Sequence, residues 1–546
     1  MATEMTKFNV QGKIVDVLSG EIYSGSVEVS DGRIINIVRD EKAEGPFILP
    51  GLIDAHVHIE SSMLLPSEFA RLAVVHGTIA TVSDPHEIAN VLGMKGVRFM
   101  IENGRKVPFK FFFGAPSCVP ATPFETSGAS LGPAEVDEML SWPEISYLSE
   151  MMNFPGVLNG NPEVLAKLAS AQKYGKPVDG HAPGVDGDNA RAYAAAGIST
   201  DHECFTTEEA IDKMDAGMKV LIREGSAARN FDELISLIKD YPEMIMFCSD
   251  DKHPDDLVNG HINLLVKRAI GAGYNLMDVL RACTLNPVKH YNLNIGLLQK
   301  GDPSDFILVD NLSDFNILKT YINGQLVAEN GHSLLQWMDE DTPNVFNAKN
   351  ITAADLAVPA LGDALKVQHA LEGQLITMLK LERARVVNGL AVSDTSRDIL
   401  KMMVMNRYAP ASPAIDFVSG FGLKRGAIAS TVAHDSHNII AVGVDDESMA
   451  RAVNLVIKAK GGISAVDGDK EMILELPVAG LMSQKDGYSV ANLYSQINEM
   501  VMQTGSSLKA PFMTLSFMAL LVIPAIKLSD RGIFDGNSFS FTSLFE

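Results

Sequence analysis

Runs of alternating apolar and polar residues open the chain and return after residue 300. Residues 26–29 and 33–38 alternate on either side of Asp31-Gly32, a pair typical of a tight β-hairpin turn. Residues 303–331 have the same texture and contain a second such pair, Asn323-Gly324. Each group has too few strands to be stable alone, so we expect both to pair in one small β-sandwich.

The stretch between these groups repeats a unit of apolar strand, polar loop and helix. Residues 162–174 and 231–240 are two of the predicted helices. Eight short apolar or β-rich runs lead into His56, Asp84, Gly114, Glu150, His181, His202, Arg223 and Asp250. Eight units in about 250 residues predict an α/β fold, a TIM-like (β/α)8 barrel with its chemistry at the C-terminal ends of the strands.

The rhythm changes after residue 350, where we expect a separate C-terminal domain of α/β or α+β type. Residues 364–383 are charged and predicted to be helical, whereas residues 426–432 predict a strand and residues 447–460 a helix. Residues 512–526 are apolar but too short for a membrane helix, and predict a buried strand pair. The predicted domains are residues 1–50 and 296–345 for the sandwich, 51–295 for the barrel and 350–546 for the C-terminal domain.

Composition narrows the class of protein. The 546 residues are 46% hydrophobic and 21% charged, which is typical of a soluble globular protein of two or three domains. A net charge of −23 argues against nucleic acid as a partner. The N-terminal residues 1–7 have no apolar stretch, so we expect no secretory signal and no membrane partner. Four widely spaced cysteines are expected to be reduced thiols of a cytoplasmic protein.

The first barrel strand ends in two histidines, His56 and His58. Residues i and i+2 of a strand share a face, so both imidazoles face one spot. Imidazole is the commonest metal ligand, and two on one face form half of a tetrahedral site. A lone H-x-H is more often a buried strand with hydrogen-bonded histidines, so the metal hypothesis needs ligands at other strand ends.

Those ligands are present. The later strand ends supply Glu150 on the fourth strand, His181 on the fifth, His202 on the sixth and Asp250 on the eighth. Barrel closure joins the first and eighth strands, so Asp250 returns to the histidine pair. Four imidazoles and two carboxylates suffice for two divalent cations, with Glu150 positioned to bridge them, and two cations can deprotonate a shared water near neutral pH. His181 or His202 alone would more often be structural, so the complete set carries the hypothesis.

This order of ligands, together with a sheet built from both sides of the barrel, resembles the amidohydrolase superfamily. Longer motifs resemble the adenine deaminase family within it; they are residues 54–63, 83–91, 149–153, 201–204, 223–229 and 249–251, with residues 433–438 and 515–520 similar to that family's C-terminal domain. Many amidohydrolases bridge their metals with a carboxylated lysine, and Glu150 in that position favours the deaminase branch. The similarity covers nearly the whole chain.

The resemblance implies hydrolytic deamination of adenine to hypoxanthine and ammonia with two Mn²⁺ or Fe²⁺ ions, or Zn²⁺, in a homodimer or higher homo-oligomer. Asp250 would take the proton of the attacking water and pass it to the leaving amine. Purine N1 needs an acid, for which Glu203 is the candidate; its alternative role is to orient His202. Asp251 is disfavoured in place of Asp250, because alternation along a strand would turn its side chain away.

Other polar residues near the strand ends are candidates for contacting the purine: Glu60, Ser61, Asp84, His86, Glu87, Arg223 and Ser226. Three of them, Asp84, His86 and Glu87, could instead hold a further ion or structure their loop, and a salt bridge is the default for Arg223. His434 and His437 could reach the active site from the second domain, but a turn-structuring role is the preferred interpretation.

Two other functions stay open. The chain could be another binuclear amidohydrolase, such as a cyclic amidase or a sugar deacetylase, or an inactive protein that binds metal or purine. Assays with a panel of substrates would distinguish another amidohydrolase from an adenine deaminase. The complete set of metal ligands counts against an inactive binding protein.

Overall fold

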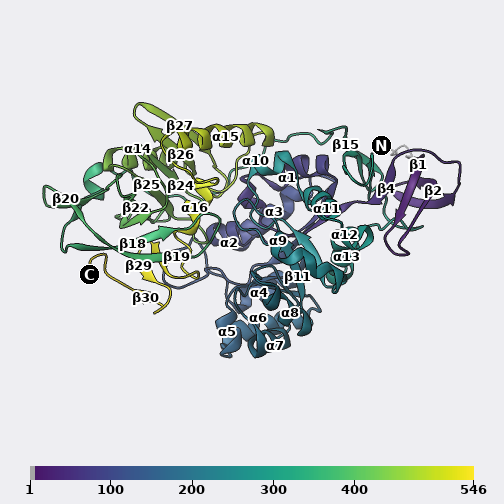
Figure 1. Cartoon of the computed structure of the whole chain (residues 1–546), viewed down its shortest axis with the longest axis horizontal. Helices are drawn as coiled ribbons and strands as arrows, with labels where there is room; N and C mark the ends of the chain where they lie inside the picture. Colours follow the sequence, from purple (N-terminus) through teal and green to yellow (C-terminus); the bar gives the residue numbers. More distant parts are fainter. Residues whose placement is uncertain (1–6) are drawn as a thin grey trace.

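The computed structural model describes residues 7–546, so the expectation about a secretory signal falls largely on residues outside the described part of the chain. Three parts follow one another along the long axis (Figure 1): the strands nearest the N-terminus, the barrel with its helices, and the C-terminal third of the chain. Among residues 7–546, no helix is both long enough and apolar enough to cross a membrane.

The barrel consists of eight short parallel strands. They are β5 (Leu52–Val57), β6 (Thr78–Ser83), β7 (Lys110–Ala115), β8 (Ile145–Met151), β9 (Val178–Gly180), β10 (Thr200–Asp201), β11 (Lys219–Arg223) and β12 (Ile245–Cys248). Strands β5–β9 form one sheet and β10–β12 another. Bridges between Val178 and Ile198 and between Val57 and Asp250 join the two sheets on both sides. The predicted TIM-like barrel is therefore confirmed.

Helices follow the strands and surround the barrel. They are α1 (Pro66–Ala73), α2 (His86–Leu92), α3 (Met94–Gly104), α4 (Pro133–Ser141), α5 (Phe154–Leu158), α6 (Pro162–Lys173), α7 (Gly187–Ala195), α8 (Thr207–Asp215), α9 (Phe231–Leu234), α10 (Pro254–Asn259), α11 (Ile262–Gly271), α12 (Leu276–Ala282) and α13 (Leu285–Tyr291). Apolar side chains of strands and helices form two large buried clusters. The scaffold therefore holds the strand ends on a packed core.

The seam between the first and last barrel strands lies at the residues predicted to bind metal. The backbone N–H of Asp250 donates to the carbonyl of His56 at 3.0 Å, and His58 N–H donates to the carbonyl of Asp250 at 3.3 Å. Asp250 has a φ of 53°, in the left-handed region that non-glycine residues rarely adopt. The chain therefore leaves strand geometry after Cys248, before it reaches Asp250.

The strands before the barrel and those after it share one eight-stranded sheet. Its strands are β1 (Lys7–Asp16), β2 (Glu21–Ser30), β3 (Arg33–Arg39), β4 (Phe47–Pro50), β13 (Phe306–Val309), β14 (Ile317–Ile322), β15 (Gln325–Glu329) and β16 (His332–Ser333). Strand β4 pairs with both β1 and β13, so it joins the two segments. The hairpin turn between β2 and β3 is Asp31-Gly32, with φ of 51° and 75° as its tight turn requires.

A second eight-stranded sheet forms the centre of the C-terminal third. Its order is β19 (Thr377–Arg383), β18 (Ala364–Ala370), β23 (Ala414–Ser419), β22 (Leu400–Met405), β25 (Ile439–Gly443), β24 (Ala427–Ser430), β26 (Gly462–Asp467) and β27 (Lys470–Glu475). Helix α14 (Asp446–Ala459) packs on one side in a cluster of its own. Helices α15 (Gly487–Gln503) and α16 (Pro511–Phe517) belong to the cluster that continues into the barrel.

Smaller elements complete this third. They are β17 (Val358–Pro359), β20 (Arg385–Val387) and β21 (Leu390–Val392) in one three-stranded sheet, and β28 (Ile526–Ser529), β29 (Gly532–Asp535) and β30 (Ser540–Phe541) in another.

Two predictions for the C-terminal third were wrong. Residues 364–383 form the hairpin β18–β19 and no helix. Their charged residues suggested a helix, but buried Leu365 and Val367 alternate with period two, and Gly373 lies in the turn. Residues 512–526 form helix α16, a turn and the start of β28 in place of a strand pair. Pro511 opens that helix, and a short run buried on all sides has no periodicity that distinguishes helix from strand.

Candidate active site

The histidines of the first barrel strand meet two carboxylates. The Nε2 atoms of His56 and His58 lie 3.3 Å apart. Asp250 Oδ1 is 3.6 Å from the first of these nitrogens and 3.2 Å from the second. Glu150 Oε1 lies 3.3 Å from His58 Nε2. Residues nearly 200 positions apart in the sequence thus direct four donor atoms to one point.

The other oxygen of Glu150 belongs to a second group. Glu150 Oε2 is 2.8 Å from His181 Nδ1 and 3.2 Å from His202 Nε2. The Glu150 carboxylate therefore lies between two pairs of imidazoles, with one oxygen towards each pair. This is the arrangement that a bridging ligand requires.

The donor set fits a pair of divalent cations. Ligands about 2.1 Å from one ion are roughly 3.0–3.4 Å from each other, close to the separations seen here. Nε2 of His202 is buried and has no hydrogen-bond partner among the described residues. Burial lowers the pKa of His58, but the carboxylates of Asp250 and Glu150 raise it by more, to well above its usual value. The site therefore stabilises positive charge, which is what a divalent cation brings.

The guanidinium of Arg223 lies beside the metal-donor side chains and pairs with two carboxylates, those of Asp250 and Glu203. Its Nη1 donates to Asp250 Oδ2 at 2.7 Å and contacts Glu203 Oε1, and its Nη2 donates to Glu203 Oε2 at 3.2 Å. Burial raises the pKa of Glu203, but Arg223 and the neighbouring imidazoles lower it by more, so the carboxyl is ionised. Burial also raises the pKa of Asp250, but Arg223 and the neighbouring imidazoles lower it by more, so this pKa lies well below its usual value.

The candidate metal ligands lie beside two adjoining cavities between the barrel and the C-terminal third. The inner cavity, of about 40 Å³, touches the metal-ligand candidates, and the outer one measures about 690 Å³. Glu203 and His181 line both cavities. The outer cavity is mainly apolar; its lining includes Met152, Phe154, Phe205, Leu375, Ile376 and Val522. A flat ring can therefore pack against the apolar wall of the outer cavity, with one edge towards the acidic residues of the inner cavity.

His434 lies at the site, contrary to the preferred turn interpretation, whereas His437 does structure its turn: its Nδ1 accepts from Ala433 N–H at 3.3 Å. Both side chains contact the carboxylate of Glu87, His434 through Nδ1 and His437 through Nε2. His434 lines the inner cavity and stacks on Phe517 with 5.0 Å between ring centroids. Burial raises the pKa of Glu87, but the two imidazoles outweigh burial and hold it well below its usual range.

Three of the residues predicted to contact purine line the inner cavity: His86, Glu87 and Arg223. The others are buried nearby with partners of their own. Glu60 accepts from Ile88 N–H and Ser61 donates to Asp251, while Asp84 lies 3.1 Å from His86.

Ser226 is also engaged elsewhere. It donates to Asp256 at 2.6 Å and accepts from His253 N–H, and it does not line either cavity.

Sequence reasoning missed part of the cavity wall. Asp251 lines the inner cavity because the left-handed backbone at Asp250 ends the alternation on which its exclusion rested. The C-terminal third adds Leu375, His434, Asp435, Phe517, Leu520 and Val522. The H-x-x-H spacing and the family-like residues 433–438 and 515–520 were the signals for this contribution; Leu375 and Val522 have no distinguishing pattern.

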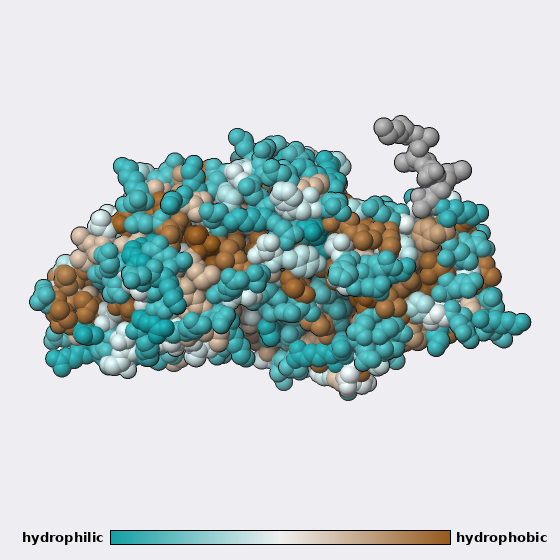
Figure 2. All heavy atoms as spheres, turned by 90° about the horizontal axis from the view of Figure 1, so that it is seen from above, coloured by the Kyte–Doolittle hydropathy of each residue, from teal (hydrophilic) through white to brown (hydrophobic). Residues whose placement is uncertain are grey.

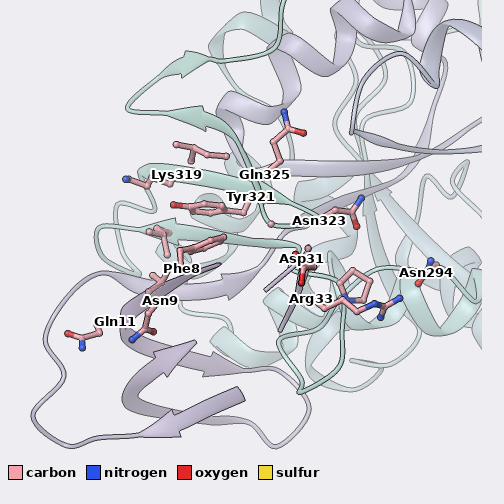
Figure 3. A pocket seen from close by; sticks show the side chains of 16 residues that line it. Phe8, Asn9, Gln11, Asp31, Arg33, Asn294, Lys319, Tyr321, Asn323 and Gln325 are labelled. Carbon is pink, nitrogen blue, oxygen red and sulfur yellow. The ribbon is translucent and has the colours of Figure 1, made fainter. Parts of the chain in front are cut away.

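A larger cavity, of about 1140 Å³, lies elsewhere (Figure 3). It is an open hollow over the sheet shared by β1 and β14, lined by Phe8, Arg33, Lys319 and Tyr321 among others. Its described lining residues include one acid, Asp31, and no histidine. The donor chemistry therefore makes the barrel strand ends the candidate active site.

A buried lysine holds the ends of β9 and β10. The ammonium of Lys213 donates to Ala182 O at 2.7 Å and to Glu209 at 2.8 Å, and lies 3.2 Å from Asp201. Ala182 and Asp201 adjoin the metal-ligand candidates His181 and His202.

Replacing Lys213 with methionine is expected to lower the free energy of unfolding by about 3–5 kcal/mol, because buried carboxylates lose their counter-charge. Urea denaturation measures this. In the control Lys173→Met, which breaks an exposed pair with Asp137, the change should stay within about 1 kcal/mol. Equal changes in both variants would contradict the structural role.

Known proteins with similar sequences support one family. The sequence profile of the Amidohydrolase family matches residues 47–327, and that of the Adenine deaminase C-terminal domain matches residues 374–540. The chain is 55% identical over 540 residues to an adenine deaminase of Salinibacter ruber, covering 98% of this chain and 99% of the relative. It is 52% identical over 544 residues to an adenine deaminase of Methanosarcina barkeri, with 98% and 99% covered.

Similarity to solved structures is much weaker. An N-acetyl-D-glucosamine-6-phosphate deacetylase from Mycobacterium smegmatis is 16% identical with a TM-score of 0.46, covering 59% of this chain and 100% of that one. Likeness at this level carries no argument about substrate.

Proposed function

The chain belongs to the adenine deaminase family of amidohydrolases, and on that basis we propose that it converts adenine and water to hypoxanthine and ammonia. One observation carries the proposal: six metal-donor side chains converge at strand ends, beside a cavity closed by the C-terminal domain that this family shares. It is thus a hydrolase whose site is built for divalent metal.

We assign the ligands as two groups. His56, His58 and Asp250 would hold one cation, His181 and His202 the other, and Glu150 both. Imidazole and carboxylate donors suit Mn²⁺ or Fe²⁺, and Zn²⁺ as well. When bound, such a pair lowers the pKa of a shared water to about 7 and so supplies a nucleophile.

The chain's own residues then move the protons. Asp250 is ionised and lies at the metal-donor group, so it accepts the proton of the water that attacks C6 and returns it to the departing amine. Arg223 keeps Asp250 and Glu203 fixed and charged. Glu203 faces both cavities, which favours a role at purine N1 over a purely orienting one. Because its pKa is lowered, it must first gain a proton, which it gives to N1 and takes back from the C6 hydroxyl as hypoxanthine forms.

The variant Glu203→Gln separates these two roles. If Glu203 delivers a proton to N1, kcat falls by about 10²–10⁴ while bound metal is unchanged. If it only orients His202, which is 3.5 Å away, metal affinity falls by about 10–100-fold. We expect the first result. Steady-state kinetics together with metal analysis of the same preparation measure both quantities.

The C-terminal domain would bind the purine through the contact between His434 and Glu87. His434→Ala is expected to raise KM for adenine by about tenfold or more, because a buried carboxylate at the cavity loses a charged partner. Metal content should be unchanged, and His434→Gln, which keeps a donor, should recover part of the loss. An unaltered KM in both variants would show that the contact is only structural.

The proposal itself has a direct test. Purified protein loaded with Mn²⁺ should convert adenine to hypoxanthine with release of one ammonia, and a chelator should abolish the activity until metal is restored. A cyclic amide and an acetylated amino sugar serve as competing substrates. Turnover of either, with adenine untouched, would replace the proposed function by another amidohydrolase activity.

We further propose a cytoplasmic location and a homo-oligomer. Cys118, Cys204, Cys248 and Cys283 are free and buried, as is typical of a reducing compartment. The domain limits 1–50 and 296–345, 51–295 and 350–546 likewise stay proposals.

A further inference from the structure

The outer edge of the C-terminal sheet is apolar and open. Strand β19 is the first strand of that sheet and pairs with β18 on one side only. Six of the exposed large apolar side chains fall within residues 376–387: Ile376, Met378, Leu379, Leu381, Val386 and Val387. Figure 2 shows hydrophobic side chains gathered at the end of the molecule where β20 lies in Figure 1. Such an edge is a template for another strand.

The hydrogen bonds at the two ends of β19 show which of its residues direct their backbone N–H and C=O groups outwards. On the outer side Thr377 N–H donates to Pro524 O at 3.0 Å and Ala525 N–H donates to Thr377 O at 3.2 Å. On the inner side Ala384 N–H donates to Asp363 O at 2.9 Å. Successive residues of a strand alternate in direction, so Leu379, Leu381 and Arg383 direct their N–H and C=O groups outwards. Of these, the Arg383 carbonyl already accepts from Arg397 at 2.8 Å.

Charge selects one way in which this edge can pair with itself. A two-fold axis at Leu381 places Leu381 opposite its own copy and Lys380 opposite Glu382 of the second copy, twice. Glu382 also pairs with Arg397 of its own chain at 3.4 Å, so Lys380 of the second copy would add a second cation to that pair. An axis at Lys380 or at Glu382 would place like charges face to face, which is unfavourable. An axis at Leu379 would require Thr377, whose outer groups are already bonded.

We propose that β19 is a dimer interface, in which two copies of this chain join edge to edge, antiparallel, about a two-fold axis at Leu381. The two sheets then form one continuous sheet across the dimer. The pairing is confined to residues 379–383, because the outer side of Thr377 is already bonded to Pro524 and Ala525 of the same chain. This surface is separate from the metal-donor group, so the proposal stands or falls independently of the catalytic one.

Cross-linking tests the position of the axis. In full-length Leu381→Cys, the new thiols face each other across the axis, whereas the four native cysteines are buried. Mild oxidation or a short bis-maleimide should convert most of this variant to a covalent dimer. Leu361→Cys is the matched control, because Leu361 is 82% exposed and lies outside the interface. Equal cross-linking of both variants, or none of Leu381→Cys, would overturn the proposal.

Charge reversal tests the register. Lys380→Glu should raise the dimer dissociation constant at least about tenfold, measured by light scattering across a dilution series, because it opposes like charges twice. The double variant Lys380→Glu/Glu382→Lys restores the pairing and should return to within about threefold of the parent. Lys470→Glu on β27, the opposite edge of the sheet, is the control and should have no effect. A chain that is monomeric at tens of micromolar, or a dimer insensitive to Lys380→Glu, contradicts the inference.

Discussion

Replacing Glu150 with glutamine is expected to lower kcat/KM for adenine by about 10³-fold or more and to reduce bound metal. One carboxylate oxygen lies 3.3 Å from His58 and the other 2.8 Å from His181. Glutamine keeps the volume but presents an amide N–H₂ to one of the two groups, where no ligand atom remains. Initial rates and metal analysis of the same preparation check both parts of the expectation.

Glu125→Gln is a matched control for this variant. Glu125 is also buried, and burial together with the nearby Asp435 raises the pKa of its carboxyl well above its usual value, which favours the neutral form. Glutamine should therefore replace it with activity within about threefold of the parent. A full set of metals and normal turnover in Glu150→Gln would refute the bridging role.

The second large effect is expected from Asp250→Asn, which should lower kcat by about 10²–10⁴. Asparagine can still accept from Arg223 but cannot take a proton from the attacking water. The loss should therefore appear in kcat, with KM for adenine changed much less. Steady-state kinetics over a range of adenine concentrations distinguish the two parameters.

Asp251→Asn provides the comparison. Asp251 also faces the inner cavity, but burial and the charge of Asp250 raise its pKa, and its carboxylate accepts from Ser61. We expect its kcat to stay within about tenfold of the parent. If the two variants are equally impaired, the proton relay must be assigned to Asp251 or to both carboxylates.

The strand-end histidines show what the sequence can predict. His56, His58, Glu150, His181, His202 and Asp250 follow apolar runs, and a parallel barrel collects the ends of such runs on one face. The fold and the convergence of donors therefore depend on periodicity and connection rules alone. Predicting them does not require the energy of any individual side-chain interaction.

The cavity wall could not be predicted in the same way. The contact between Glu87 and His434 joins residues about 350 positions apart in two different parts of the chain, and no periodicity links them. Asp251 was misplaced because the left-handed φ of Asp250 depends on tertiary closure of the barrel. The charged composition of residues 364–383 is typical of a helix, but Leu365 and Val367 are buried with the period of two that belongs to a strand.

The division of the site between two folded units has a consequence for how specificity can evolve. The barrel supplies the donors for the cations, whereas His434 and Phe517 come from the second unit and meet the substrate side of the cavity. Mutations in that second unit can reshape what the pocket accepts while the chemistry of water activation is inherited intact. Mutations in the C-terminal third can thus adapt the pocket to other ring systems or leaving groups, while the metal-donor residues of the barrel stay unchanged.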